Sequence, residues 1–108
     1  MTIRINTELI DSWASFHQVF KTALGFPDYY GANMNAWIDC MTYIDDPTTG
    51  MTRITVKPGQ TVVIELANSD NFKNNHEDIY YALTDCAAFV NGRKIEDKSW
   101  TCIAIARL

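Results

Sequence analysis

The chain has 108 residues, which is long enough for one domain with a single core and too short for two. Its hydrophobic content of 47% and charged content of 20% are those of an ordinary globular protein, and no apolar run approaches the ~20 residues that a membrane helix requires. The formal net charge of −4 argues against general nucleic-acid binding, which needs a basic surface.

Residues 2–6 alternate apolar and polar side chains, which predicts a short β-strand. The same stretch lacks the apolar core of a signal peptide, so we expect a cytoplasmic protein without membrane contact. A helix follows, with Asp11 or Ser12 as its N-cap. Gly25 suits the left-handed position after this helix, and Pro27 prevents its continuation. The apolar side chains that recur at helical spacing and should face the core are Trp13, Phe16, Val19, Phe20, and Ala23 or Leu24.

A second helix is predicted after a turn at residues 29–32, with Asn33 as its cap. The sequence Asp45-Asp46-Pro47 ends it. Its buried stripe should consist of Met34, Trp37, Ile38, Met41 and Ile44. The opposite ridge, which should face solvent, carries Asn35, Asp39, Thr42 or Tyr43, and Asp46. This helix therefore buries one side and displays a polar, acidic side.

The second half of the chain reads as two buried strands separated by helical segments. Residues 48–59 form a polar connector with room for an extended piece at 52–56. Residues 60–67 are a nearly continuous apolar run, typical of a strand covered on both faces. The remaining pattern predicts one helical turn near Phe72, a helix at 76–91 that Gly92 ends, a charged loop at 93–98 and a buried strand at 100–106. The residues of the 76–91 helix that should face inward are Ile79, Tyr80, Leu83, Ala87 and Val90.

The order of strand, helix, helix, strand, helix and strand favours an α/β fold in a single domain, with helices packed on a small, mainly parallel sheet. The three cysteines, Cys40, Cys86 and Cys102, each lie inside an apolar-patterned segment, and no C-x-x-C pair is present. We therefore expect buried, reduced thiols in a reducing compartment, without a redox motif or a zinc ribbon.

Residues suited to catalysis or metal binding are few. His17 and His76, the only histidines, have no metal-ligand spacing, and neither a phosphate-binding glycine loop nor a G-x-S-x-G motif occurs. The carboxylate of Asp39 should raise the pKa of the neighbouring Cys40 thiol, which argues against a nucleophile. A hydrolase built from Asp39 with Asp45 or Asp85 would need one carboxyl tuned as an acid, and nothing in the sequence does this. We therefore predict no enzyme activity, no metal and no cofactor.

The charge excess lies in one segment. Between residues 28 and 46 there are four carboxylates, of Asp28, Asp39, Asp45 and Asp46, and no Lys or Arg. Tyr29, Tyr30 and Tyr43 lie beside them and should be exposed. Aromatic anchors in a field of one sign are typical of a protein–protein interface, so the sequence predicts a basic protein partner.

This segment resembles the barstar family, the intracellular inhibitors of the secreted ribonuclease barnase. The similarity covers the first 45 residues. It is carried by Phe16-His17-Gln18, Lys21, Leu24, Pro27 to Gly31, Asn33, Ala36, Asp39-Cys40 and Thr42. The resemblance implies a barstar-like α/β fold with a three-stranded parallel sheet over residues 1–108. It also implies that the second helix and its preceding loop plug a ribonuclease active site by imitating RNA phosphates.

Carried over by residue, Tyr29, Gly31, Asn33 and Asp39 match the inhibitory motif, with Asp39 as the main anion. Asp85 matches a peripheral acidic contact of the family.

The chain also departs from the family pattern. Asn35 stands where the family has a second acid, Ile38 replaces an aromatic residue, and the 48–59 connector is longer. These differences imply a changed target or a weaker affinity, with Asp45 and Asp46 as candidates to restore the lost charge.

The resulting hypothesis is an inhibitor, such as an immunity protein or antitoxin, that is monomeric when free and binds a basic ribonuclease with 1:1 stoichiometry. Its expected partner-binding residues are Tyr29, Tyr30, Gly31, Asn33, Asn35, Asp39, Thr42, Tyr43, Asp46 and Asp85. Two alternatives remain: a regulatory binding module with a non-nuclease partner, which Asn35 motivates, and a small enzyme.

Overall fold

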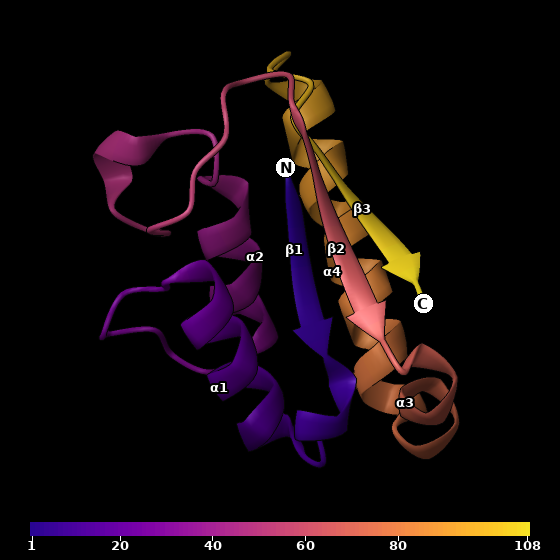
Figure 1. Cartoon of the computed structure of the whole chain (residues 1–108). Coiled ribbons are helices and arrows are strands. Elements are labelled where there is room, and N and C mark those ends of the chain that lie inside the picture. The colour runs from indigo at the N-terminus through magenta and orange to yellow at the C-terminus, as the bar shows by residue number, and fades with distance from the viewer.

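The computed structural model describes residues 1–108 and contains a sheet of three parallel strands with four α-helices (Figure 1). The strands are β1 (Thr2–Asn6), β2 (Thr61–Ala67) and β3 (Cys102–Arg107), in the spatial order β1-β2-β3. Ile64 at the centre of β2 pairs with Ile3 on β1 and with Ile105 on β3. The predicted α/β fold with a three-stranded parallel sheet is confirmed.

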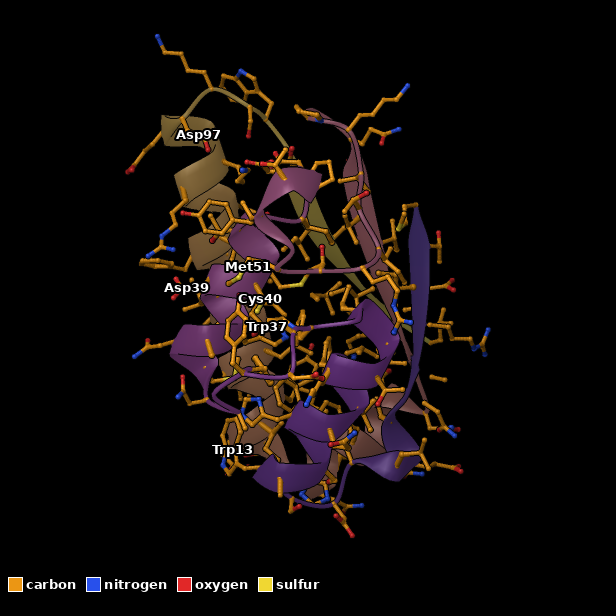
Figure 2. The ribbon with its side chains drawn as sticks, turned by 90° about the vertical axis from the view of Figure 1, so that its left-hand side faces the viewer. Trp13, Trp37, Asp39, Cys40, Met51 and Asp97 are labelled. Carbon is orange, nitrogen blue, oxygen red and sulfur yellow. The ribbon has the colours of Figure 1, made fainter.

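The helices cover only one face of this sheet. Figure 2, which views the molecule from the side of α1 and α2, shows the helices on one side of the strands. On the covered face, Ile5, Ile64 and Leu66 are fully buried. On the other face, Arg4 is exposed and Glu65 is half-buried. The expectation that β2 is covered on both faces was wrong, because Glu65 interrupts the apolar run on the side that faces solvent.

Helix α1 (Trp13–Leu24) begins and ends where the sequence predicts. Ser12 is its N-cap and forms a reciprocal capping box with Ser15, and Gly25 follows it in the left-handed conformation with φ of +69°. Phe16 and other members of the apolar stripe are buried, but Trp13 is 38% exposed and lies at the helix start. The predicted burial of Trp13 was therefore wrong.

Helix α2 (Met34–Thr42) has the predicted phase. The side chain of Asn33 accepts a hydrogen bond from the Ala36 N–H at 2.8 Å, which caps the helix. Trp37 is fully buried and packs edge-on against Phe20 of α1, with ring centroids 5.9 Å apart. This anchor fixes the rotation of α2, so that the side opposite Trp37 faces solvent.

The long connector between α2 and β2 contains a short 3₁₀ turn (Pro47–Thr49) and no strand. Its backbone bonds to the ends of the helices: the Arg53 N–H donates to the Leu24 carbonyl at 3.0 Å, and the Val56 N–H donates to the Ile44 carbonyl at 3.0 Å. The extended piece expected at 52–56 therefore does not join the sheet. The connector instead covers the ends of α1 and α2.

Helix α3 (Ser69–Asn75) is a short helix around Phe72, and α4 (Glu77–Glu96) is longer than predicted. The predicted stop at Gly92 and the charged loop at 93–98 were wrong, since α4 continues to Glu96. A glycine inside a helix costs only about 1 kcal/mol. The helix continues through Gly92 and brings Arg93 and Lys94 into contact with Thr42 of α2. The residues of α4 predicted to face inward are all buried: Ile79, Tyr80, Leu83, Ala87 and Val90.

The last strand begins later than predicted, at Cys102. Trp100 is exposed and has a positive φ of 64°, so it belongs to the turn before the strand. No helix of the protein has the length and apolar character needed to cross a bilayer.

Candidate protein-binding site

The loop before α2 presents backbone and one large aromatic side chain to solvent. Tyr29 is 74% exposed, and its hydroxyl donates a long hydrogen bond to the sulfur of Met51 at 3.6 Å. Gly31 and Asn33 are also exposed. The side-chain amide of Asn33 forms two hydrogen bonds. Its oxygen caps α2, and its nitrogen donates to the Gly31 carbonyl at 3.4 Å. The loop is therefore fixed to the helix that it precedes.

Tyr30 is not the exposed anchor that the sequence suggested. It is half-buried, and its hydroxyl lies 2.5 Å from Nδ1 of His17, in hydrogen-bond contact. Its ring packs against Phe26 with centroids 4.8 Å apart. Burial raises the pKa of Tyr30, with the thiolate that Cys40 forms at high pH as a smaller cause, and burial lowers the pKa of His17. Both groups are thus neutral at physiological pH, and together they secure the loop to α1.

Three predicted residues do share the exposed ridge of α2 and its C-terminal end: Asn35, Asp39 and Tyr43. Figure 2 shows Asp39 projecting from α2 at the edge of the molecule, while Trp37 lies inside. Thr42 was wrongly expected on this ridge. It is only 9% exposed, and its hydroxyl donates to the Ile38 carbonyl at 2.7 Å. This local bond turns the Thr42 side chain toward α4.

Asp45 was expected to add charge to the surface, and the structure contradicts this. Its carboxylate accepts a hydrogen bond from Lys94 Nζ at 3.0 Å and another from the Thr101 hydroxyl at 2.6 Å. Both side chains of the Asp45–Lys94 pair are only 6% exposed. The pair is therefore an internal link between the end of α2 and the end of α4, and it does not face a partner.

The carboxylate of Asp46 is also engaged in hydrogen bonds within the chain. Its carboxylate accepts hydrogen bonds from the hydroxyl and the backbone N–H of Thr48, and these bonds lower the pKa of Asp46. It serves as the cap of the 3₁₀ turn that follows. Of the acidic residues between 28 and 46, Asp28 and Asp39 remain as exposed carboxylates.

A cation lies beside Asp39, contrary to the expectation of an uncompensated acidic field. Arg93 Nη1 is 3.4 Å from Asp39 Oδ1 and 3.3 Å from the Thr42 hydroxyl oxygen. The guanidinium also lies over the Phe89 ring, 4.8 Å from its centroid. The loop predicted at 93–98 gives no position for Arg93 relative to α2, so the sequence does not indicate this cation. A helix that continues through Gly92 places Arg93 one turn after Phe89, and this spacing indicates the contact of the guanidinium with the Phe89 ring.

These residues surround a shallow polar groove between α2 and α4. Its lining consists of Asp39, Thr42, Tyr43, Arg93, Lys94, Glu96 and Asp97. The exposed side chain of Asp85 lies on α4, one turn before Phe89, and forms no hydrogen bond or ion pair. The groove and the neighbouring ridge of α4 thus extend the exposed surface of α2.

The thiol of Cys40 is buried beneath this surface. Burial, with a smaller contribution from Asp39, raises its pKa to about 11, so the thiol is protonated at neutral pH and unsuited to act as a nucleophile. All three cysteines are free, although Cys86 and Cys102 are only half-buried. No cluster of three His, Cys, Asp or Glu side chains could hold a metal ion. The arrangement is suited to binding another molecule through side chains of both charges.

A family model described as Barstar (barnase inhibitor) matches residues 1–105, so the match extends over all four helices, the long connector and all of the sheet except the last two residues of β3. The chain therefore belongs to the Barstar family.

Proposed function

We propose that this protein inhibits a barnase-like ribonuclease by placing α2 and its preceding loop in the active site of the enzyme. The observation that carries the proposal is the exposed carboxylate of Asp39 on a helix whose opposite side is anchored by buried Trp37, in a chain of the Barstar family. A carboxylate can occupy the place of an RNA phosphate because both are anions that accept hydrogen bonds from Arg, Lys and His.

The surface supports this role because it is preorganised. The cap made by Asn33 and the bond between Tyr30 and His17 hold the loop before a partner arrives. Little conformational entropy is then lost on binding, which favours affinity. Tyr29, Asp39 and Tyr43 are the exposed side chains that would contact the enzyme.

The partner would be a basic ribonuclease bound with 1:1 stoichiometry by a monomeric inhibitor. Opposite charges steer such an association, and salt screens the attraction. An immunity or antitoxin role in the cytoplasm follows if the ribonuclease is a toxin made by the same cell.

The test is inhibition of purified barnase by the wild-type protein and by Asp39→Ala, at low and high salt. We expect wild type to inhibit, and Asp39→Ala to weaken binding by at least ~2 kcal/mol, the scale of an interface hot spot. Association with wild type should slow as salt rises.

Asp70→Ala is the matched control. Asp70 is also an exposed aspartate paired with an arginine, Arg107, but it lies on α3, away from α2 (Figure 1). If Asp39→Ala inhibits barnase as well as Asp70→Ala does, the proposed mimicry of phosphate by Asp39 is wrong.

A second candidate function is a binding module with a non-nuclease partner. Two observations favour it: Asn35 carries no charge where the resemblance implies an acid, and Arg93 places a cation beside Asp39. Capture of a non-nuclease protein that wild type retains and Asp39→Ala loses, together with no inhibition of barnase, would support this alternative.

A further inference from the structure

Arg93 is held against the binding surface by several contacts. Its guanidinium lies over Phe89, and its Nη1 donates to the Thr42 hydroxyl at 3.3 Å and to Asp39 at 3.4 Å. Stacking on an aromatic ring and bonding to a neutral hydroxyl do not depend on Asp39. Phe89 of α4 and Thr42 of α2 therefore hold the cation beside Asp39 without a contribution from Asp39 itself.

The ion pair is accessible and weak. The Arg93 and Asp39 side chains are 42% and 58% exposed, and a single contact at 3.4 Å joins them. Exposed pairs of this kind contribute little to stability. Nevertheless, a cation that approaches Asp39 from a partner meets a carboxylate whose Oδ1 already accepts from Arg93, and it also meets the positive charge of Arg93.

We propose that Arg93 is a specificity-determining residue of the partner-binding surface: it competes with the partner's cation for Asp39. This inference rests on the proposed function, because it takes α2 as the inhibitory surface. A partner that offers only cations is penalised by the nearby guanidinium. A partner that also places a carboxylate or carbonyl oxygen beside its cation can receive Arg93 while it binds Asp39.

This selection acts through repulsion of unsuitable partners as well as attraction of the correct one. This selection agrees with the rest of the surface. Asn35 is uncharged where the Barstar family has an acid, and Arg93 adds a positive charge. The site is consequently a mixed pair of charges and not the single-sign field that residues 28–46 suggest when read alone. The surface therefore favours a ribonuclease whose active site places an acidic group beside the phosphate-binding cation, and it disfavours one that presents cations alone to Asp39.

The test uses barnase as the probe and compares four proteins: wild type, Arg93→Met, Asp39→Ala and the double variant. Met retains much of the Arg side-chain stem over Phe89 and removes the charge. Arg107→Met is the matched control, because Arg107 also pairs with an aspartate, Asp70, and lies over an aromatic ring, Tyr80. Both substitutions change the net charge by the same amount, so the comparison removes the effect of net charge, and the double variant isolates the contact with Asp39.

We expect Arg93→Met to bind barnase about two- to fivefold more tightly than Arg107→Met does, the range of one exposed ion pair. In the Asp39→Ala background, Arg93→Met should give less than half of this gain, because no carboxylate remains for the two cations to share.

The proposal is overturned if Arg93→Met binds no more tightly than Arg107→Met, or if the gain is equally large without Asp39. It is also overturned if neither wild type nor Arg93→Met binds barnase, since Arg93 then does not decide whether barnase is accepted. The first two of these results are distinct from failure of the proposed function, which is shown by unchanged inhibition on Asp39→Ala substitution or by the absence of binding to barnase in both proteins. Binding gained by Arg93→Met where wild type shows none would support the proposal.

Discussion

At the scale of single residues, the buried ion pair of Asp45 and Lys94 is the arrangement that most requires complete hydrogen bonding. The Lys94 ammonium has three donors, and these find three acceptors: Asp45 Oδ1 at 3.0 Å, the Thr42 carbonyl at 2.9 Å and Asp97 Oδ2 at 3.3 Å. Thr101 satisfies the second oxygen of Asp45. Full hydrogen bonding is what makes a buried pair tolerable, since the desolvation of two charges is otherwise unfavourable.

Removal of one partner from this pair should therefore destabilise the fold. In Lys94→Met, Asp45 keeps only its bond from Thr101 and remains buried, so we expect the free energy of unfolding to fall by about 3–5 kcal/mol. The control Arg107→Met breaks an exposed pair and should lose about 1 kcal/mol or less. Urea unfolding of both variants measures the difference. Equal losses would show that the Asp45–Lys94 pair is not a structural link.

At the scale of elements, the length of α4 decides what the binding surface contains. If the helix ended at Gly92, Arg93 and Lys94 would not be held in helical register beside α2. Gly92 has an ordinary helical backbone, and a Cβ built on it meets no atom within 4 Å. Gly25 differs: it has a φ of +69°, and a Cβ there would lie 2.5 Å from Cβ of Arg53. One glycine is replaceable and the other is required.

Two alanine substitutions test this distinction. Gly92→Ala should raise the free energy of unfolding by about 0.5–1 kcal/mol, because alanine favours the helix and restricts the unfolded chain. Gly25→Ala should lower it by at least about 1–2 kcal/mol, from the left-handed backbone alone. Thermal or urea unfolding gives both values. Destabilisation by Gly92→Ala would mean that the helix is not continuous through this position in solution.

At the scale of the whole molecule, the sequence predicts features that local patterns determine. The strands, the caps at Ser12 and Asn33 and the phase of α2 follow from residues near one another in the chain. The contact between Asp39 and Arg93 joins residues that are 54 positions apart, so no local charge count could reveal it. The same is true of Asp45, whose neighbours suggest an exposed acid, whereas its environment is set by Lys94.

The pH dependence of stability is a further property of the whole domain. Near neutral pH, this dependence is determined by the burial of His17. Burial keeps the pKa of His17 below 6.5 in the folded state, so the unfolded chain takes up a proton first as the pH falls. The contribution of neutral His17 to the free energy of unfolding is therefore complete well above pH 6.5. It is lost as the pH falls toward the lowered pKa of His17 in the folded state. Asp46 and Asp97 act in a separate range, since hydrogen bonds lower their pKa values from 3.8.

We accordingly expect the free energy of unfolding to decrease as the pH falls below about 6.5, and to decrease less in His17→Gln, which keeps a polar group near Tyr30 but cannot take up the proton. Urea unfolding at a series of pH values measures the slope, and NMR titration of the imidazole measures the pKa of His17 directly. Equal slopes for the two proteins, together with an imidazole pKa at its ordinary value, would show that His17 is not buried as a neutral partner of Tyr30. The loop before α2 would then lack the internal support that the proposed inhibitory surface requires.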